Sequence, residues 1–180
     1  MKKTAALLAP SNAVKVLYFM SDFPGKDFVS GGIQKATGLS KMGVYLALKE
    51  LEREGFLQAH KIGKTFIYRI NHKNPVLKQM KTVKNVSVIV PLVDKLKEYS
   101  EKIILFGSAS RGEDSFGSDY DLFILTRDKE EVQAVLDKFK SARKVQAKIM
   151  GAVEFSNLKS SDRVFYDEVI RGITLWESEK

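Results

Sequence analysis

The chain has 180 residues, with 30 Lys or Arg against 22 Asp or Glu, and 44% of its residues are hydrophobic. This length and content suffice for two small hydrophobic cores. The sequence has no Cys, which excludes disulfides and Cys-based zinc sites, and its two His are too few for a His-rich metal site. No apolar segment is long enough to span a membrane.

The first nine residues begin like a signal peptide. Their apolar run is too short, however, and a charged amphipathic segment follows in place of a cleavage site. Together with the absence of Cys, this pattern predicts a cytoplasmic protein.

Positive charge is concentrated near the N-terminus. Residues 1–73 contain twelve Lys or Arg and five Asp or Glu, whereas residues 74–180 contain eighteen and seventeen. Such a local excess predicts a module that binds a polyanion.

Helical spacing and capping signals predict three helices in this basic region. They cover residues 13–20 after Ser11, residues 31–37 before Gly38, and residues 41–54 between Ser40 and Gly55. Residues 56–70 then predict a hairpin that turns near Gly63.

The third helix has an apolar face of Val44, Leu48 and Leu51. The order of elements resembles the winged helix-turn-helix of bacterial and archaeal transcriptional regulators. The resemblance implies that the third helix enters the major groove of double-stranded DNA and that the hairpin touches the backbone. The residues predicted to contact DNA are Lys41, Met42, Tyr45, Lys49, His60, Lys61 and Lys64.

Other interpretations of this module stay open. The same charge would serve a dimerisation or RNA-binding winged helix. Met42 and Leu46 are unusual on a DNA-facing surface and are also consistent with contact to a protein.

Residues 74–100 predict a helical connector. Asn74-Pro75 starts a short helix, and Pro91 favours a break followed by a new helix, because proline suits a helix start and not a helix interior.

The most informative stretch is residues 103–125. An apolar strand leads to Gly107 and Ser108, and ten residues later Asp119 and Asp121 flank Tyr120. Alternate residues of a strand share a face, so the two carboxylates project together. Such a pair suits Mg²⁺, which completes its shell with water and phosphate oxygens.

This pattern resembles the polymerase-beta-like nucleotidyltransferases, and in particular their small, minimal branch. The resemblance implies Mg²⁺ and a nucleoside triphosphate as ligand or substrate. It assigns Asp119 and Asp121 to metal and catalysis. Nucleotide contacts are expected from Gly107, Ser108, Arg111 and Ser118.

Active members usually carry a third carboxylate on a later strand. The candidate strand, residues 145–150, follows a helix expected over residues 129–142 and offers Gln146 and Lys148 but no acid. Glu154 is the nearest later acid, and we expect it to face a helix N-terminus instead.

The tail predicts fold completion. A helix is expected from residue 164 to a left-handed cap at Gly172, followed by a last strand with Ile173, Leu175 and Trp176.

The sequence therefore predicts an α+β fold with a DNA-binding domain (1–73), a connector (74–100) and a nucleotidyltransferase-like domain (101–180). Two functions remain open. One is a transcriptional regulator whose second domain binds nucleotide and Mg²⁺ and is catalytically degenerate. The other is an active enzyme that transfers a nucleoside monophosphate to a small molecule, protein or nucleic acid. A homodimer is expected, and the family resemblance allows a helical partner protein of the toxin–antitoxin type.

Overall fold

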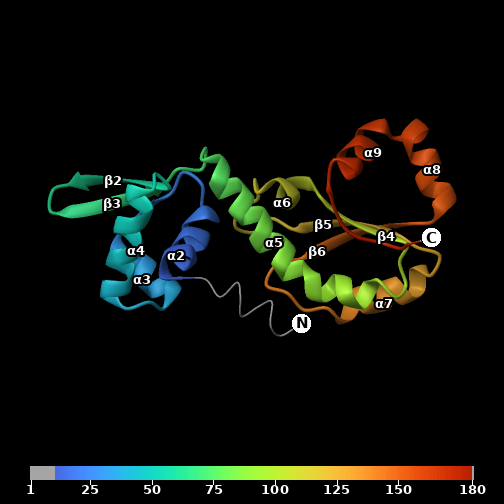
Figure 1. Ribbon diagram of the computed structural model, residues 1–180, viewed down its shortest axis with the longest axis horizontal. Helices are drawn as coiled ribbons and strands as arrows, with labels where there is room; N and C mark the ends of the chain where they lie inside the picture. The colour runs from blue at the N-terminus through green and yellow to red at the C-terminus, as the bar shows by residue number, and fades with distance from the viewer. Residues whose placement is uncertain (1–10, 180) are drawn as a thin grey trace. The chain divides into compact units, whose positions relative to one another are not determined.

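The computed structural model describes residues 11–179, so the signal-peptide-like start lies outside the described residues. The fold is α+β, and the chain divides into two units between Lys81 and Thr82 (Figure 1).

The N-terminal unit is a winged helix-turn-helix. Its elements are α2 (Asn12–Ser21), β1 (Asp27–Phe28), α3 (Ser30–Thr37), α4 (Lys41–Arg53), β2 (Leu57–Ile62) and β3 (Thr65–Ile70). The strands form an antiparallel sheet in the order β1-β3-β2. The structure confirms the predicted helices and hairpin of this unit, whereas the two-residue strand β1 was not predicted.

The predicted helix boundaries are stabilised by side chains and glycines. The Ser11 and Ser40 hydroxyls accept hydrogen bonds from the N–H groups of Val14 and Gly43. Gly38 ends α3 with a φ of 69°, a left-handed conformation that favours glycine. These local signals explain why the chain forms separate short helices around one core.

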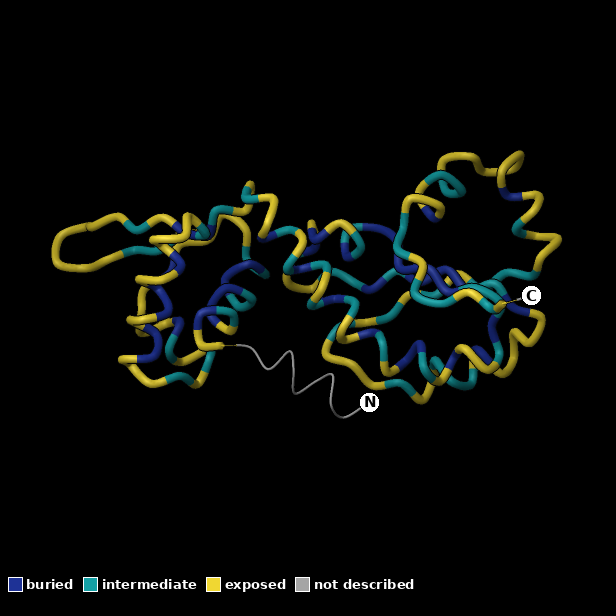
Figure 2. Tube along the Cα trace, viewed as in Figure 1, coloured by how far each residue is buried: buried dark blue, intermediate teal, exposed yellow. Residues whose placement is uncertain are grey.

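That core lies between the helices and the base of the hairpin, and the rest of the hairpin is largely exposed (Figure 2). Val16, Leu17, Ile33, Leu48 and Leu57 are buried there.

The helix α5 (Pro75–Leu96) contributes to both units. Leu77 packs in the N-terminal core, whereas Ile89 and Leu92 pack in the C-terminal core. Pro91 lies inside this helix, so the predicted break is wrong. Burial of Ile89, Leu92 and Leu96 on both sides of Pro91 outweighs the one backbone hydrogen bond that proline removes.

The C-terminal unit is a mixed sheet with helices on both faces (Figure 1). Its remaining elements are β4 (Lys102–Phe106), α6 (Gly107–Arg111), β5 (Tyr120–Leu125), α7 (Lys129–Lys138), β6 (Val145–Met150), α8 (Ala152–Ser161), α9 (Arg163–Ile170) and β7 (Ile173–Glu177). The strand order is β6-β5-β4-β7, with β5 and β6 parallel and the other neighbours antiparallel.

The two faces of this sheet bury different side chains. Ile103, Leu105 and Leu122 belong to the core shared with α5 and α7. Ile104 and Phe123 pack with side chains of α8 and α9. Asp121 is two residues before Phe123 in β5, and residues two apart in a strand point to the same face of the sheet. The Asp121 carboxylate therefore lies on the α8–α9 side.

Two predicted features of the unit are wrong. Helix α7 ends at Lys138 and not near residue 142, because the backbone becomes extended at Phe139. Gly172 is not a left-handed cap, since its φ is not positive. A Cβ there would lie 2.5 Å from the Leu105 carbonyl oxygen, so close packing of α9 on β4 requires the glycine.

Candidate functional site

The candidate site of the C-terminal unit lies where β4 turns into α6. Gly107 follows the strand with a φ of 69°. A Cβ at Gly107 would lie 2.6 Å from Asp121 Oδ2. The glycine therefore lets the turn between β4 and α6 lie directly against the Asp121 carboxylate.

The first turn of α6 has no side-chain cap. Ser108 is partly exposed in this turn, and the Ser110 hydroxyl donates to the Gly107 carbonyl at 2.8 Å. Uncapped N–H groups at a helix start suit a phosphate oxygen. This turn therefore offers hydrogen-bond donors to an oxyanion such as a phosphate.

Asp119 and Asp121 lie close enough to influence each other. Burial raises the pKa of Asp121, and the nearby carboxylates of Asp119 and Glu168 raise it further, while Arg143 opposes them. A site that disfavours a buried negative charge also favours a cation beside it. The two predicted carboxylates are thus brought together, and Glu168 of α9 is a third acid nearby that the sequence pattern did not indicate.

The neighbouring strand presents an amide to the carboxylate pair. Gln146 pairs in register with Asp121, and its Nε2 donates to Asp119 Oδ2. Glu154 lies elsewhere, as expected: its carboxylate accepts from the Gly151 N–H at 2.7 Å and pairs with Lys129. The backbone hydrogen bond and Lys129 lower the pKa of Glu154.

A cavity of about 440 Å³ opens beside these groups. Its polar lining includes Asp121, Gln146 and Lys148, and its apolar lining includes Phe106 and Phe165. The pocket places an ammonium, an amide and a carboxylate on the same α8–α9 side of the sheet.

The two other residues predicted to contact nucleotide, Arg111 and Ser118, form ion pairs or hydrogen bonds with residues of the protein itself. Arg111 pairs with Glu113 at 3.1 Å and with Glu168 at 3.7 Å. The Ser118 hydroxyl accepts from the Ser115 N–H at 2.9 Å, which shapes the loop before β5.

Arg143 is a functional candidate that sequence reasoning missed. Its guanidinium lies 4.2 Å from the centroid of the Tyr120 ring. Its Nε and Nη2 donate to the carbonyl oxygens of Ser118 and Asp119, at 2.5 and 3.3 Å. Arg143 thereby fixes the backbone that carries the first carboxylate.

A buried acid anchors this arginine. Arg143 Nη1 lies 2.8 Å from Asp114 Oδ2, and the Asp114 side chain is 1% exposed. Asn85 of α5 donates to Asp114 Oδ1 and to the Ala109 carbonyl, both at 2.9 Å. Three residues far apart in the sequence therefore position the loop between α6 and β5.

The family of this unit follows from a direct comparison. A family model described as "Polymerase beta, Nucleotidyltransferase" matches residues 91–180. The chain belongs to this nucleotidyltransferase family. Its nucleotidyltransferase domain combines the glycine turn and the carboxylate pair that the sequence motif predicted.

A search of the curated proteins gave no match. Among solved structures, AF1382 from Archaeoglobus fulgidus is 20% identical, with 47% of this chain and 96% of that chain covered and a TM-score of 0.41. The homodimeric winged helix-turn-helix domain Mb0332 from Mycobacterium bovis is 21% identical, with 47% and 75% covered and a TM-score of 0.37. TrmBL2, an archaeal chromatin protein, is 14% identical, with 88% and 72% covered and a TM-score of 0.33.

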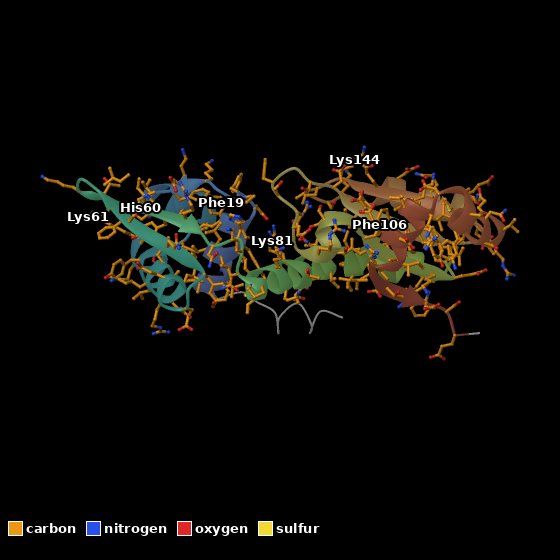
Figure 3. All side chains as sticks on the ribbon, turned by 90° about the horizontal axis from the view of Figure 1, so that it is seen from above. Phe19, His60, Lys61, Lys81, Phe106 and Lys144 are labelled. Carbon is orange, nitrogen blue, oxygen red and sulfur yellow. The ribbon has the colours of Figure 1, made fainter. Side chains whose placement is uncertain are left out.

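The N-terminal unit presents its predicted contact residues on one helix and one hairpin. Lys41, Met42, Tyr45 and Lys49 are exposed on α4, opposite the buried Val44 and Leu48. His60 and Lys61 lie on β2 (Figure 3) and are exposed, and Lys64 is exposed in the turn beside Gly63.

Two kinds of feature are absent from residues 11–179. Among residues 11–179, no three His, Cys, Asp or Glu side chains come together in a group that could hold a metal ion. None of the helices in the described part of the chain has the length and hydropathy that crossing a bilayer requires.

Proposed function

We propose that this protein is a DNA-binding transcriptional regulator whose nucleotidyltransferase domain binds a nucleotide with Mg²⁺. The exposed face of α4 is the main support for DNA binding. Its lysines Lys41 and Lys49 lie opposite the face that packs in the core, so the charge of this helix is presented outward. A helix of this kind fits the major groove of DNA.

The hairpin supports the same function. His60, Lys61 and Lys64 are exposed on or beside its strands, where a wing contacts the sugar-phosphate backbone. Nearly all of the net charge of +8 comes from the first 73 residues. Electrostatic attraction to phosphates supplies a large share of the affinity of such modules.

Selection of bound sequences from a random duplex pool tests the proposal, followed by footprinting of the selected site. We expect a defined protected sequence, and a variant with Lys41→Ala and Lys49→Ala should lose it. Absence of any enriched sequence would contradict a regulatory role.

A homodimer is the assembly we propose for this function, because a symmetric dimer reads two half-sites of a pseudopalindrome. Sedimentation velocity of the free protein and of its complex with the selected site measures the stoichiometry. One protein chain per operator would contradict the dimer.

The residues present fit one Mg²⁺ ion held jointly with nucleotide phosphates. Mg²⁺ is commonly bound by one or two carboxylates together with phosphate oxygens and water. Asp119 and Asp121 supply such carboxylates, and the Gly107 turn lies against Asp121. The bound ion would neutralise phosphate charge, and the α6 N–H groups and Ser108 would hold the phosphates.

The same residues fit a two-metal site poorly, because Gln146 stands beside Asp119 where a third carboxylate would be expected. An amide is a weaker ligand for Mg²⁺ than a carboxylate and carries no charge. We therefore propose that the domain binds nucleotide but transfers it slowly or not at all.

Active nucleotidyl transfer is the second candidate, favoured by the intact carboxylate pair. Incubation with each α-labelled nucleoside triphosphate, with analysis of labelled protein and nucleic acid, decides between them. We expect no label with the wild-type protein. Transfer that disappears in Asp121→Asn would establish the enzyme instead.

A further inference from the structure

The N-terminal unit contains a groove between α4 and the hairpin. It has a volume of about 520 Å³, within the range of about 300–1,000 Å³ that is typical of ligand pockets. Three aromatic rings, Tyr45, Phe66 and Tyr68, line it together with three lysines. These lysines are Lys41, Lys49 and Lys64.

The rings in this groove are available to a ligand. Tyr45 is 51% exposed and Phe66 is 52% exposed. Phe66 and Tyr68 stack with ring centroids 6.5 Å apart and an interplanar angle of 27°. The hydrophobic core of the unit uses Tyr68 only as a partly buried neighbour and does not include the other two rings.

Lysines lie close to the exposed rings. Lys49 Nζ is 5.9 Å from the Tyr45 ring centroid, and Lys61 Nζ is 5.9 Å from that of Phe66. The groove therefore combines positive charge with exposed ring faces. Glu52 is the acid that lines it.

An intact duplex offers the exposed ring faces little to stack on. Bases inside a duplex are stacked on one another, so they present to an apolar ring only their edges, such as a thymine methyl group, and contacts to phosphates need hydrogen-bond donors. The Phe66 ring has no polar atom. A lysine-lined groove with aromatic faces is the combination that binds unpaired bases, which stack on the rings while the lysines follow the backbone.

We propose that this groove holds unpaired bases of a DNA strand that leaves a duplex. The inference rests on the proposed function, DNA binding by the N-terminal unit, and extends it to the class of DNA preferred. The ligand is a duplex with a single-stranded extension, and Phe66 and Tyr45 provide the stacking surfaces.

Fluorescence anisotropy with two labelled DNAs tests this proposal. One is a blunt duplex, and the other is the same duplex with a six-nucleotide 3′ extension. The variants are Phe66→Leu and Tyr45→Leu, which keep an apolar side chain and remove the ring. Ile62→Ala is the matched control, since Ile62 lies on the same hairpin and is 59% exposed but does not line the groove.

We expect the wild-type protein to bind the extended duplex about tenfold more tightly than the blunt one, as stacking of a single base would provide. Phe66→Leu should remove most of this preference and leave blunt-duplex affinity unchanged, and Tyr45→Leu should also reduce the preference. Ile62→Ala should keep the preference. Circular dichroism confirms that each variant is folded.

Equal wild-type affinity for the two DNAs would overturn this inference and leave the proposed function intact. An equal loss of affinity for both DNAs in Phe66→Leu would also overturn the inference, because the ring would then contact the duplex. Failure to bind either DNA would overturn the proposed function itself.

Discussion

Gly107 and Asp121 are in direct contact, and their contact explains why the motif needs a glycine. A Cβ at residue 107 would lie 2.6 Å from Asp121 Oδ2, where no methyl group fits. The glycine also has a φ of 69°. The turn and the carboxylate therefore depend on one another.

Gly107→Ala should displace the Asp121 carboxylate and weaken nucleotide binding, in addition to a cost of about 1–2 kcal/mol for the left-handed backbone. Gly117→Ala is the matched control, because Gly117 has a φ of 87° but no atom within 4 Å of a Cβ. Thermal unfolding should show a loss for both variants. Calorimetry should show weakened nucleotide binding only for Gly107→Ala, and equal binding by both variants would contradict the proposed contact.

Arg143→Met should destabilise the protein by about 3 kcal/mol, because it removes the guanidinium that pairs with the buried Asp114 carboxylate. Arg127→Ala serves for comparison, since Arg127 pairs with Glu101 with its own side chain 80% exposed; its cost should stay below about 1 kcal/mol. Chemical denaturation measures both. In the double variant Arg143→Met, Asp114→Asn the two losses should not add, and full additivity would argue against the coupling.

Asp121→Asn should stabilise the protein at neutral pH while removing metal-dependent binding. Burial and neighbouring carboxylates raise the pKa of Asp121 in the folded state. The folded state therefore gains most from Asp121 when the group is protonated, and this contribution is lost as the pH rises through the raised pKa. The Tm of the variant minus that of the wild type should increase from about pH 4, near the ordinary pKa of Asp, to pH 7.

The exposed carboxylate Asp137 on α7 provides a control for that experiment. Asp137→Asn should show a Tm difference from the wild type that does not rise over the same pH range. A lower Tm for Asp121→Asn than for the wild type at pH 7 would contradict the account of this site.

Lys41→Ala and Lys49→Ala should each weaken DNA binding and reduce the slope of log K against log salt concentration by about 0.9, if each lysine neutralises one phosphate. Lys95→Ala removes the same charge from an exposed position of the other unit and should leave the slope unchanged. Anisotropy titrations at several salt concentrations measure all three. A change in slope with Lys95→Ala as large as that with Lys41→Ala would indicate that the surface is not localised on α4.

Local sequence signals predicted most of the fold. Ser40 and Gly38 mark helix ends because capping and left-handed turns depend on residues close in sequence. The predictions at Pro91 and Gly172 were wrong because tertiary packing determines the backbone conformation at both positions. Buried neighbours keep the helix intact around Pro91, and a backbone carbonyl lies against Gly172.

In the candidate site, too, the residues of a local motif were predicted and those brought together by the fold were not. Gly107, Asp119 and Asp121 stand in one motif and were predicted together. Arg143 and Asp114 are 29 residues apart and are joined only by the fold, so no periodicity or spacing indicates them. The same holds for Glu168, whose influence on Asp121 depends on the way α9 packs against the sheet.

Calorimetric titration of ATP, GTP, CTP and UTP tests the central claim most directly. Each is added with and without Mg²⁺ to the wild-type protein and to the variant Asp119→Asn, Asp121→Asn. The account predicts that at least one nucleotide binds the wild-type protein only with Mg²⁺, and that the double variant does not bind it. Binding that survives in the variant, or no binding of any nucleotide to the wild-type protein, would contradict a nucleotide site at this carboxylate pair.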